Sequence, residues 1–483
     1  MAGEVTISEN CPFAGTVINV QDHGAAGDDS VDDTDELRAA IAAAGEGGAI
    51  YFPPGTYIVS QRLVAKPRQL FFSLTDATIK VKAEEGTYAF PVFEVAAGPV
   101  EFRRLTLDLV ESRPPKPDTE APPGILAQAA GGTVDLVISS CRIRGGYGQG
   151  IRVSGSGDSG RDRVIVRDSL VEDCYETGIA LGRVNGARVE ASRVEKCRSG
   201  IVAASCRDVV IDAVTAADNR RHGVVFRFSH DWHVSNCLAV GNGGTETDQD
   251  KLRGWGIVAG GGPDTPAPPP NSDFTITDNI CRDNYDGGIT LDPTRADDPT
   301  AVLAQRARVS GNVCRGRRRG KLLGEGDLLG EHGIHVRNSS DVVVTDNLCH
   351  RNTNSGIQLV NDRHVLVQAN ACYDNANGIG LFSDDDVKAP GRHVIGVNML
   401  YDNDEELKQG DFKMQARSLP GVRLFGLHGT ETPECTRRAN PGTLFELHDD
   451  RNGTGALYVK ALGSGTTGWV EVSTQPEQPC PSI

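Results

Sequence analysis

The 483-residue sequence predicts an all-β solenoid, in which short strands stack coil upon coil. The first observation is a phrase that returns at a basal spacing of 22 or 23 residues, which is too short for a repeat of paired helices. Each copy is a glycine followed by alternating apolar residues, as expected for a strand that follows a turn. The glycines of these copies are Gly150, Gly178, Gly200, Gly223, Gly256, Gly288, Gly333, Gly356 and Gly378.

A column of asparagines is the second observation, because one Asn follows an alternating strand in five successive coils. Stacked Asn side chains can hydrogen-bond from coil to coil, and a cysteine lies two residues after four of them. Cysteine is small and readily buried, and no Cys-x-x-Cys spacing occurs, so these thiols are predicted to fill the interior rather than bind metal. The residues are Asn279, Asn312, Asn347, Asn370 and Asn398, with Cys281, Cys314, Cys349 and Cys372.

Composition excludes several classes of function. A formal charge of −16 argues against a nucleic-acid or membrane-surface binder, since those partners are held by clustered Lys and Arg. No apolar run approaches the ~20 residues of a membrane helix, and the first residues do not read as a signal peptide. The chain is therefore expected to be cytoplasmic as written, or extracellular if a native leader has been removed.

Residues 18–60, "INVQDHGAAGDDSVDDTDELRAAIAAAGEGGAIYFPPGTYIVS", resemble the N-terminal segment of right-handed parallel β-helix proteins of the pectate-lyase-like superfamily. From the residues alone, Asp33 and Glu36 form a capping box that opens a helix with Leu37, Ala40 and Ile41 on its buried face. This helix is expected to cover the end of the solenoid. The fold class is therefore an all-β, right-handed parallel β-helix with an N-terminal capping helix and a small C-terminal β-module.

Three segments are expected along the chain. Residues 1–44 hold the N-terminal segment and capping helix, 45–420 the parallel β-helix, and 421–483 a small β-module and tail. The last segment resembles C-terminal pieces of tailspike-like proteins, a resemblance that implies a homotrimer through this module. Cys435 and Cys480 could pair there.

Period-2 alternation assigns the direction of each side chain in the phrases. Residues one and three positions after each glycine are expected to face inward, and those two and four positions after it to face solvent. Long insertions fall in three consecutive coils between Gly223 and Gly333, so they are expected to flank one groove. Side chains able to do chemistry gather in the outward columns of the same region. The residues of these columns include Val225, Val258, Thr290, His335, Gln358, Arg227, Asp292 and Arg337.

The stretch "RRHGVVFRFSHDWHVSN" (220–236) is expected to be half surface and half site. Phe226 is predicted to be core, and Arg227 to face the groove. His230, Asp231 and His233 are expected past the strand, as solvated turn residues.

"RRHG", "SHDW" and "NCLAVGNG" in this region resemble the repeats of mannuronan C5-epimerases, over about a hundred residues. The resemblance implies that Arg221 and His222 contact substrate. The family's Asp-Pro-His catalytic motif would fall on Ala180, Leu181 and Gly182, which cannot perform acid–base chemistry. The sequence therefore predicts an active site that lies elsewhere, on the coils of Gly288 and Gly333.

We expect a carbohydrate substrate, no metal and no cofactor, with a calcium ion left open. In a polyuronide lyase or epimerase, arginines would neutralise the sugar carboxylate while an imidazole or phenol exchanges the C5 proton. The alternatives are a glycoside hydrolase or transglycosylase using Asp292 with Glu331 or Asp286, and a non-catalytic glycan-binding or tailspike-like protein. An ion-paired surface ladder of Asp and Arg is the structural alternative. The candidate catalytic residues are Asp292, His335, Arg337, Glu331, His332 and Tyr285, and the candidate substrate-binding residues are Arg227, Arg221, His222, Trp255, Asp286, Thr290 and Gln358.

Overall fold

The computed structural model divides the chain into two units, the first comprising residues 1–274 and 278–286 and the second residues 275–277 and 287–483. Side chains are described over 15–82, 90–96, 98–110, 121–128, 132–157, 160–244, 254–260, 270–291, 304–316, 332–382 and 394–403. After residue 404 the structure describes the backbone of strands only.

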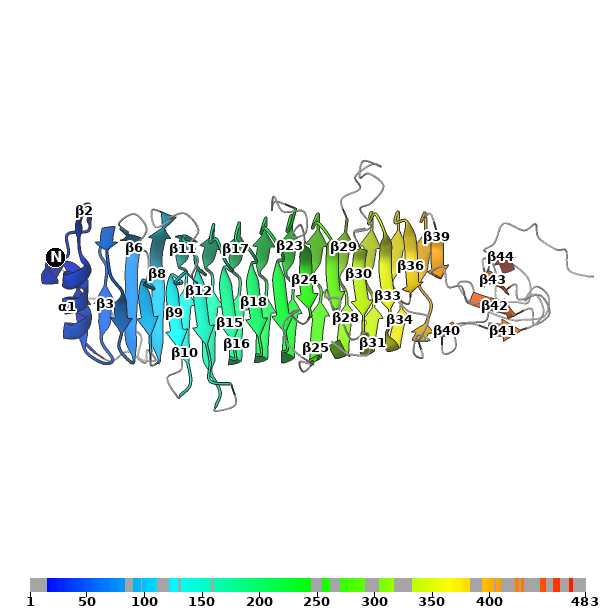
Figure 1. Ribbon diagram of the computed structural model, residues 1–483, viewed down its shortest axis with the longest axis horizontal. Helices are drawn as coiled ribbons and strands as arrows, with labels where there is room; N and C mark the ends of the chain where they lie inside the picture. The colour runs from blue at the N-terminus through cyan, green and yellow to red at the C-terminus, as the bar shows by residue number, and fades with distance from the viewer. Residues whose placement is uncertain are drawn as a thin grey trace, which may run out of the picture. The chain divides into compact units, whose positions relative to one another are not determined.

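The N-terminal end of the first unit is covered by helix α1 (Thr34–Ala44), as predicted (Figure 1). Leu37, Ala40 and Ile41 are buried on its inner face. The predicted capping box is wrong. Asp33 is the N-cap residue, but its side chain makes no cap hydrogen bond. Its carboxylate instead accepts hydrogen bonds from the backbone N–H groups of Ala26, Gly27 and Ile58, and thereby ties the helix to the first coils.

The strands that carry the glycine phrases and the strands that continue the same sheet are here called the phrase strands, and they pair in parallel with those of neighbouring coils. In the first unit they include an additional copy, "GILA" at 124–127, which the sequence reading missed. The first-unit strands are β5 (Leu63–Ala65), β7 (Phe93–Val95), β9 (Ile125–Gln128), β12 (Ile151–Ser154), β15 (Ile179–Gly182), β18 (Ile201–Ala204), β21 (Val224–Arg227) and β24 (Trp255–Ala259). Those of the second unit are β27 (Gly287–Leu291), β30 (His332–Arg337), β33 (Ser355–Val360), β36 (Asn377–Phe382) and β39 (Glu405–Gln409).

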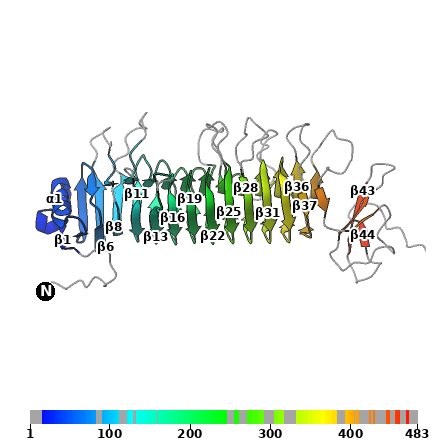
Figure 2. The same ribbon diagram turned by 90° about the horizontal axis from the view of Figure 1, so that it is seen from below.

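The rest of each coil consists of two strands that meet at a bend, and Figure 2 shows β13, β16, β19 and β22 of the first unit side by side. The first-unit bend strands are β1 (Val17–Asn19), β2 (Asp28–Asp32), β3 (Ala49–Tyr51), β4 (Gly55–Val59), β6 (Gln69–Val81), β8 (Val100–Leu109), β10 (Asp135–Ser139), β11 (Arg142–Gly145), β13 (Arg163–Arg167), β14 (Leu170–Glu172), β16 (Asn185–Glu190), β17 (Arg193–Glu195), β19 (Arg207–Asp212), β20 (Thr215–Ala217), β22 (His230–Ser235), β23 (Leu238–Val240), β25 (Asn271–Thr277) and β26 (Ile280–Arg282), with the 3-10 helix η1 (Val20–His23) after β1. The second unit has β28 (Ala304–Ser310), β29 (Val313–Arg315), β31 (Ser339–Thr345), β32 (Leu348–His350), β34 (Arg363–Gln368), β35 (Ala371–Tyr373), β37 (His393–Ile395), β38 (Met399–Tyr401) and β40 (Val422–Leu424).

The core follows the predicted alternation. Ile334 and Val336 of β30 are fully buried, whereas His332, His335 and Arg337 between and beside them are only partly buried. The four predicted interior thiols are also fully buried, which confirms the predicted direction of that column: Cys281, Cys314, Cys349 and Cys372. Close packing of thiols and β-branched residues thus fills the interior.

The predicted asparagine column forms a ladder of buried amides at the bend. In the second unit Asn312 donates to Asn347 at 2.9 Å, Asn347 to Asn370 at 2.9 Å, and Asn370 to Asn398 at 3.0 Å. A second ladder, not foreseen, lies in the turns that lead into the phrase strands. It links Asn352, Asn375 and Asn403 in the second unit, and Asn219, Asn242 and Asn284 in the first.

Within the predicted C-terminal segment the backbone forms a four-stranded sheet. Strand β41 (Leu427–Gly429) pairs in parallel with β42 (Leu444–His448), which pairs antiparallel with β43 (Gly455–Lys460), and β43 pairs antiparallel with β44 (Trp469–Glu471). Cys435 and Cys480 lie outside the described residues. No helix in the described part of the chain is both long and apolar enough to cross a membrane.

Candidate functional site

The first-unit candidates Arg221 and His222 precede β21 at the turn edge. His222 Nδ1 accepts a hydrogen bond from the backbone N–H of Trp255 at 3.2 Å, which links two neighbouring coils. A neutral imidazole carries one N–H, so this bond places the proton of neutral His222 on Nε2. Arg221 and Arg227 are half-buried, and Phe226 is fully buried, as predicted.

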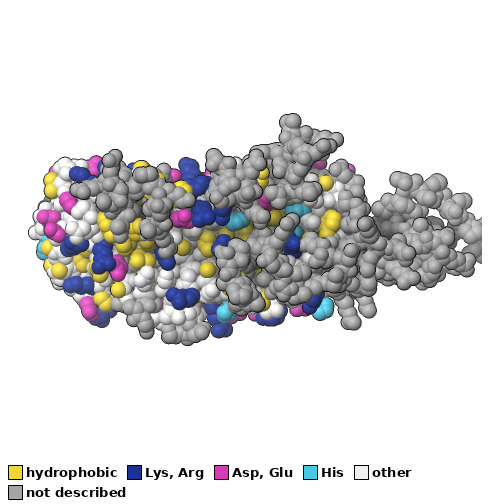
Figure 3. Space-filling model, viewed as in Figure 1, with side chains coloured by type: hydrophobic (Ala, Val, Ile, Leu, Met, Phe, Trp, Pro, Cys, Tyr) yellow, Lys and Arg dark blue, Asp and Glu magenta, His cyan; other side chains and the backbone are white. Residues whose placement is uncertain are grey.

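The outward face of β21 and β24 is apolar and covered. Val225 and Val258 were expected to face solvent but are 2% and 1% exposed, and they pack with Trp255, which is 7% exposed. Half-buried Val202 extends this cluster. Figure 3 shows the same face of the first unit, where hydrophobic side chains lie among lysines and arginines. The indole of Trp255 therefore contributes packing in this structure.

Tyr285 and Asp286 shape the turn of the first unit. Asp286 Oδ2 accepts the backbone N–H of Gly254 at 2.8 Å, and its own N–H donates to the carbonyl of Gly254 at 2.9 Å. The Tyr285 side chain lies so close to Gly243 and Gly244 that a Cβ at either glycine would approach it to 2.8 Å. Both residues are thus part of the framework of this turn.

His230, Asp231 and His233 are not in a turn, which corrects the sequence-based expectation. They belong to β22, whose Trp232 points inward and stacks between Phe226 and Phe274 with ring-centroid distances of 3.9 and 4.1 Å. Asp231 accepts a hydrogen bond from Arg207 at 3.0 Å on the exposed face. The aromatic stack explains why the strand continues there, because it buries a large apolar area.

In the second unit four candidates lie around His335. Parallel pairing places Thr290 of β27 and Gln358 of β33 opposite His335 of β30, as the sequence register predicted. The rings of His332 and His335 stack with centroids 5.2 Å apart and planes 18° from parallel. Thr290 Oγ1 lies 3.3 Å from His335 Nδ1. Arg337 follows on the same face of β30.

Electrostatics keep both imidazoles neutral at pH 7. Burial lowers the pKa of His332 to about 3. Burial also lowers the pKa of His335 well below its usual value, and the nearby His332 and Arg337 add to that effect. A charged imidazolium is costly there because it loses hydration and faces a guanidinium. Gln358 Oε1 is buried and has no hydrogen-bond partner within the described residues, so it can accept a hydroxyl from a ligand.

Asp292 and Glu331, two of the predicted catalytic carboxylates, lie outside the described residues. Their placement beside Arg337 and His332 stays a prediction. The structure describes Tyr285, Asp286, Arg221, His222, Arg227 and Trp255 in the first unit, and Thr290, His332, His335, Arg337 and Gln358 in the second.

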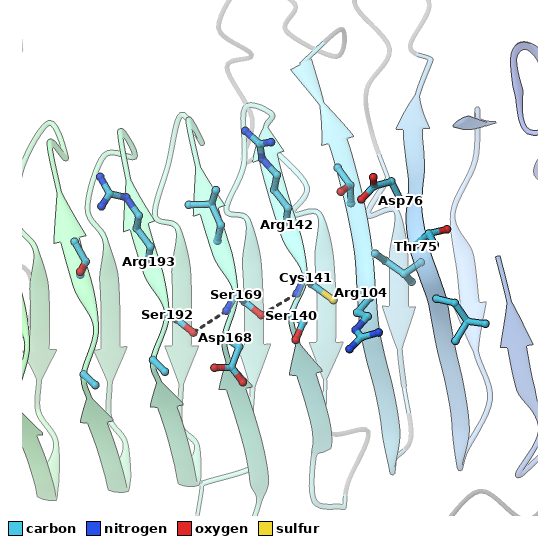
Figure 4. A pocket seen from close by; sticks show the side chains of 17 residues that line it. Thr75, Asp76, Arg104, Ser140, Cys141, Arg142, Asp168, Ser169, Ser192 and Arg193 are labelled. Carbon is cyan, nitrogen blue, oxygen red and sulfur yellow. Dashed lines mark hydrogen bonds between the residues drawn. The ribbon is translucent and has the colours of Figure 1, made fainter. Parts of the chain in front are cut away.

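A groove of about 1040 Å³ in the first unit lies on the bend between its two sheet segments and contains none of the predicted residues (Figure 4). Its labelled side chains include Arg104, Arg142, Asp168 and Arg193. Arg142 is bound to Glu172 and Arg193 to Glu195, so these guanidinium groups are already neutralised by neighbouring carboxylates. Among the described side chains, no group of three or more His, Cys, Asp or Glu could hold a metal ion.

Comparison with known families identifies the fold. The model of the right-handed β-helix region matches residues 122–263 and 270–390, more than half of the sequence, and the chain belongs to this family. The fold is thus a right-handed parallel β-helix. Residues 17–78 match the model described as rhamnogalacturonase A/epimerase, pectate lyase-like. The search of curated proteins found no match.

Solved structures share this fold at low sequence identity. The A-module of mannuronan C-5 epimerase AlgE4 from Azotobacter vinelandii is 20% identical with a TM-score of 0.54, and the match covers 84% of this chain and 100% of that one. The Dettilon tailspike protein is 16% identical with a TM-score of 0.55, covering 78% and 70%. The Streptococcus pneumoniae surface protein and adhesin PfbA is 17% identical with a TM-score of 0.52, covering 76% and 97%.

Proposed function

We propose that the chain is a carbohydrate-active enzyme that acts on an acidic glycan or glycoside by abstraction of the C5 proton, as in a polyuronide lyase or epimerase. The observation that carries this proposal is the stacked pair of neutral imidazoles, His332 and His335, with Arg337 two residues after His335 on the same face of the strand. A neutral imidazole can exchange a proton, and a guanidinium is suited to a carboxylate.

The chemistry follows from the acidity of C5–H. When this bond breaks, its electron pair moves into the sugar carboxylate, which becomes more negative and needs stabilisation. Arg337 supplies a positive charge for this role, and an imidazole takes the proton. Loss of the C4 substituent then gives a lyase product, whereas return of a proton to the opposite face gives an epimer.

The substrate would also tune the site. Arg337 is among the groups that lower the pKa of His335. A uronate carboxylate bound to Arg337 would offset the guanidinium charge, so the pKa of His335 would rise toward its usual value. A sugar hydroxyl donating to Gln358 Oε1 would fix the ring position.

Two alternative functions can be distinguished from the proposed one by experiment. A glycoside hydrolase would use Asp292 with Glu331 or Asp286, and Asp286 already accepts a backbone N–H through Oδ2. A non-catalytic glycan-binding protein would bind through the same face without turnover.

The test is incubation of the full chain with a panel of uronans and neutral glycans. An unsaturated uronate band identifies a lyase, and incorporation of solvent deuterium at C5, read by NMR, identifies an epimerase. New reducing ends without either signal would support the hydrolase. Binding without any product would support the non-catalytic protein and contradict the proposal.

A further inference from the structure

Thr290 has an unusual environment for a residue in an outward column. Its side chain is fully buried, and the one hydrogen-bond partner that the described residues give its hydroxyl is His335 Nδ1 at 3.3 Å. The partner is fixed by the parallel register, which places Thr290 directly opposite His335. The direction of this bond determines which nitrogen of His335 carries the proton.

The cost of unsatisfied groups selects one direction. If His335 Nδ1–H donated to Thr290, the buried threonine O–H would have no acceptor among the described residues. If the threonine O–H donates to Nδ1, the only unsatisfied groups are lone pairs of the threonine oxygen. Buried donors without a partner are rarer in proteins than acceptors with an unused lone pair. The second arrangement is therefore favoured. A neutral imidazole then has its single proton on Nε2.

We infer that Thr290 holds His335 as the neutral Nε2–H tautomer, so that His335 donates a hydrogen bond to the developing oxyanion of the substrate and is not the proton acceptor. Thr290 is a positioning residue in this scheme. The substrate step rests on the proposed function, whereas the tautomer does not.

This assignment divides the reaction between the two stacked rings. As the C5–H bond breaks, its electron pair moves into the carboxylate, where Arg337 and His335 Nε2–H stabilise it. The proton goes to His332, whose ring lies 5.2 Å from that of His335 between centroids. A neutral imidazole is a suitable donor in this role because its proton stays in place while negative charge develops.

The tautomer is tested by NMR of the full chain labelled with ¹⁵N-histidine at pH 7. His335→Gln assigns the His335 signals by their disappearance. The wild type should show Nε2 protonated and Nδ1 unprotonated, and Thr290→Ser should keep this pattern. Thr290→Val, which keeps the shape but removes the donor, should populate the Nδ1–H form. Wild-type His335 with its proton on Nδ1, or an unchanged pattern in Thr290→Val, would overturn the inference.

Kinetics on any uronan that the wild type converts provide the second readout. Thr290→Val should lower kcat by about tenfold with little change in KM, as expected when one oriented hydrogen bond is lost, and Thr290→Ser should stay within about threefold of wild type. Thr215→Val on the bend of the first unit is the matched control. If no uronan is converted, the proposed function fails while the NMR result stands. An unchanged kcat in Thr290→Val would contradict the role given to His335.

Discussion

Replacement of Asn347 by Ala removes the centre of the second unit's bend ladder. Asn347 is 1% exposed. Its Oδ1 accepts from the backbone N–H of Asn312 at 3.0 Å and from Asn312 Nδ2 at 2.9 Å, and its Nδ2 donates to Val309 O at 3.0 Å and to Asn370 Oδ1 at 2.9 Å.

The expected cost follows from the groups that lose a partner. Asn312 Nδ2 keeps the carbonyls of Ile276 and Ser310 as acceptors, whereas the backbone N–H of Asn312 loses Asn347 Oδ1, to which it donates at 3.0 Å. Such a buried donor costs about 1–3 kcal/mol, and the lost bond to Asn370 adds about 1 kcal/mol. Asn347→Ala should therefore lower the free energy of unfolding by about 2–4 kcal/mol.

Urea denaturation and amide hydrogen exchange measure the effect. The midpoint should fall, and the Asn312 amide should exchange faster than in the wild type. Gln368→Ala, an exposed change in the same unit, should shift the free energy by less than about 0.5 kcal/mol. An unchanged midpoint with an unchanged Asn312 exchange rate would refute the ladder argument. Lost activity at unchanged stability would make Asn347 part of a site.

Three further outcomes are expected. His335→Ala should lower the turnover of a uronan by roughly 10²-fold in steady-state kinetics, because a donor to the oxyanion is lost. Arg337→Ala should weaken the binding of an acidic glycan more than the binding of a neutral analogue in calorimetry, and equal weakening of both would contradict this role. Because the folded-state pKa of His332 is about 3, below the unfolded value, stability should be full above about pH 6.5 and fall as the pH decreases toward 3. Between pH 7 and pH 5 the urea midpoint of His332→Phe should change less than the midpoint of the wild type. An equal change in the variant and the wild type would contradict the argument from burial of His332. Nine of the twelve cysteines are described and buried, so a thiol reagent should modify at most three thiols before the protein unfolds: Cys11, Cys435 and Cys480. Modification of more than three would show that the description of the packed interior is wrong.

The coil architecture could be predicted because it is local and repeated. Glycine spacing defines the coils, and period-2 alternation sets which side chains face the interior, so the sequence alone predicts the column of Thr290, His335 and Gln358. The second amide ladder was missed, although its signal was present: an Asn lies three residues after Cys281, Cys349 and Cys372.

Other local motifs gave a wrong assignment. Asp33 and Glu36 match a capping box, but the Asp33 carboxylate binds backbone donors from the preceding loop and from β4. Those donors are distant in sequence or outside the helix, and a short motif does not include them. His230 and His233 similarly read as turn residues because the stack that holds β22 in place involves Phe274, about forty residues away.

The sequence by itself determined the solenoid, the inward and outward direction of its side chains and the register of its columns, since each of these depends on neighbours within one repeat. Tertiary structure decided how deeply an outward side chain is covered and which polar atom it meets. Val225, Val258 and Thr290 all point away from the core and are nevertheless buried. The physical reason is that burial and hydrogen-bond partners are set by chain segments from other coils, as for His335 of β30, whose Nδ1 meets the hydroxyl of Thr290 on β27.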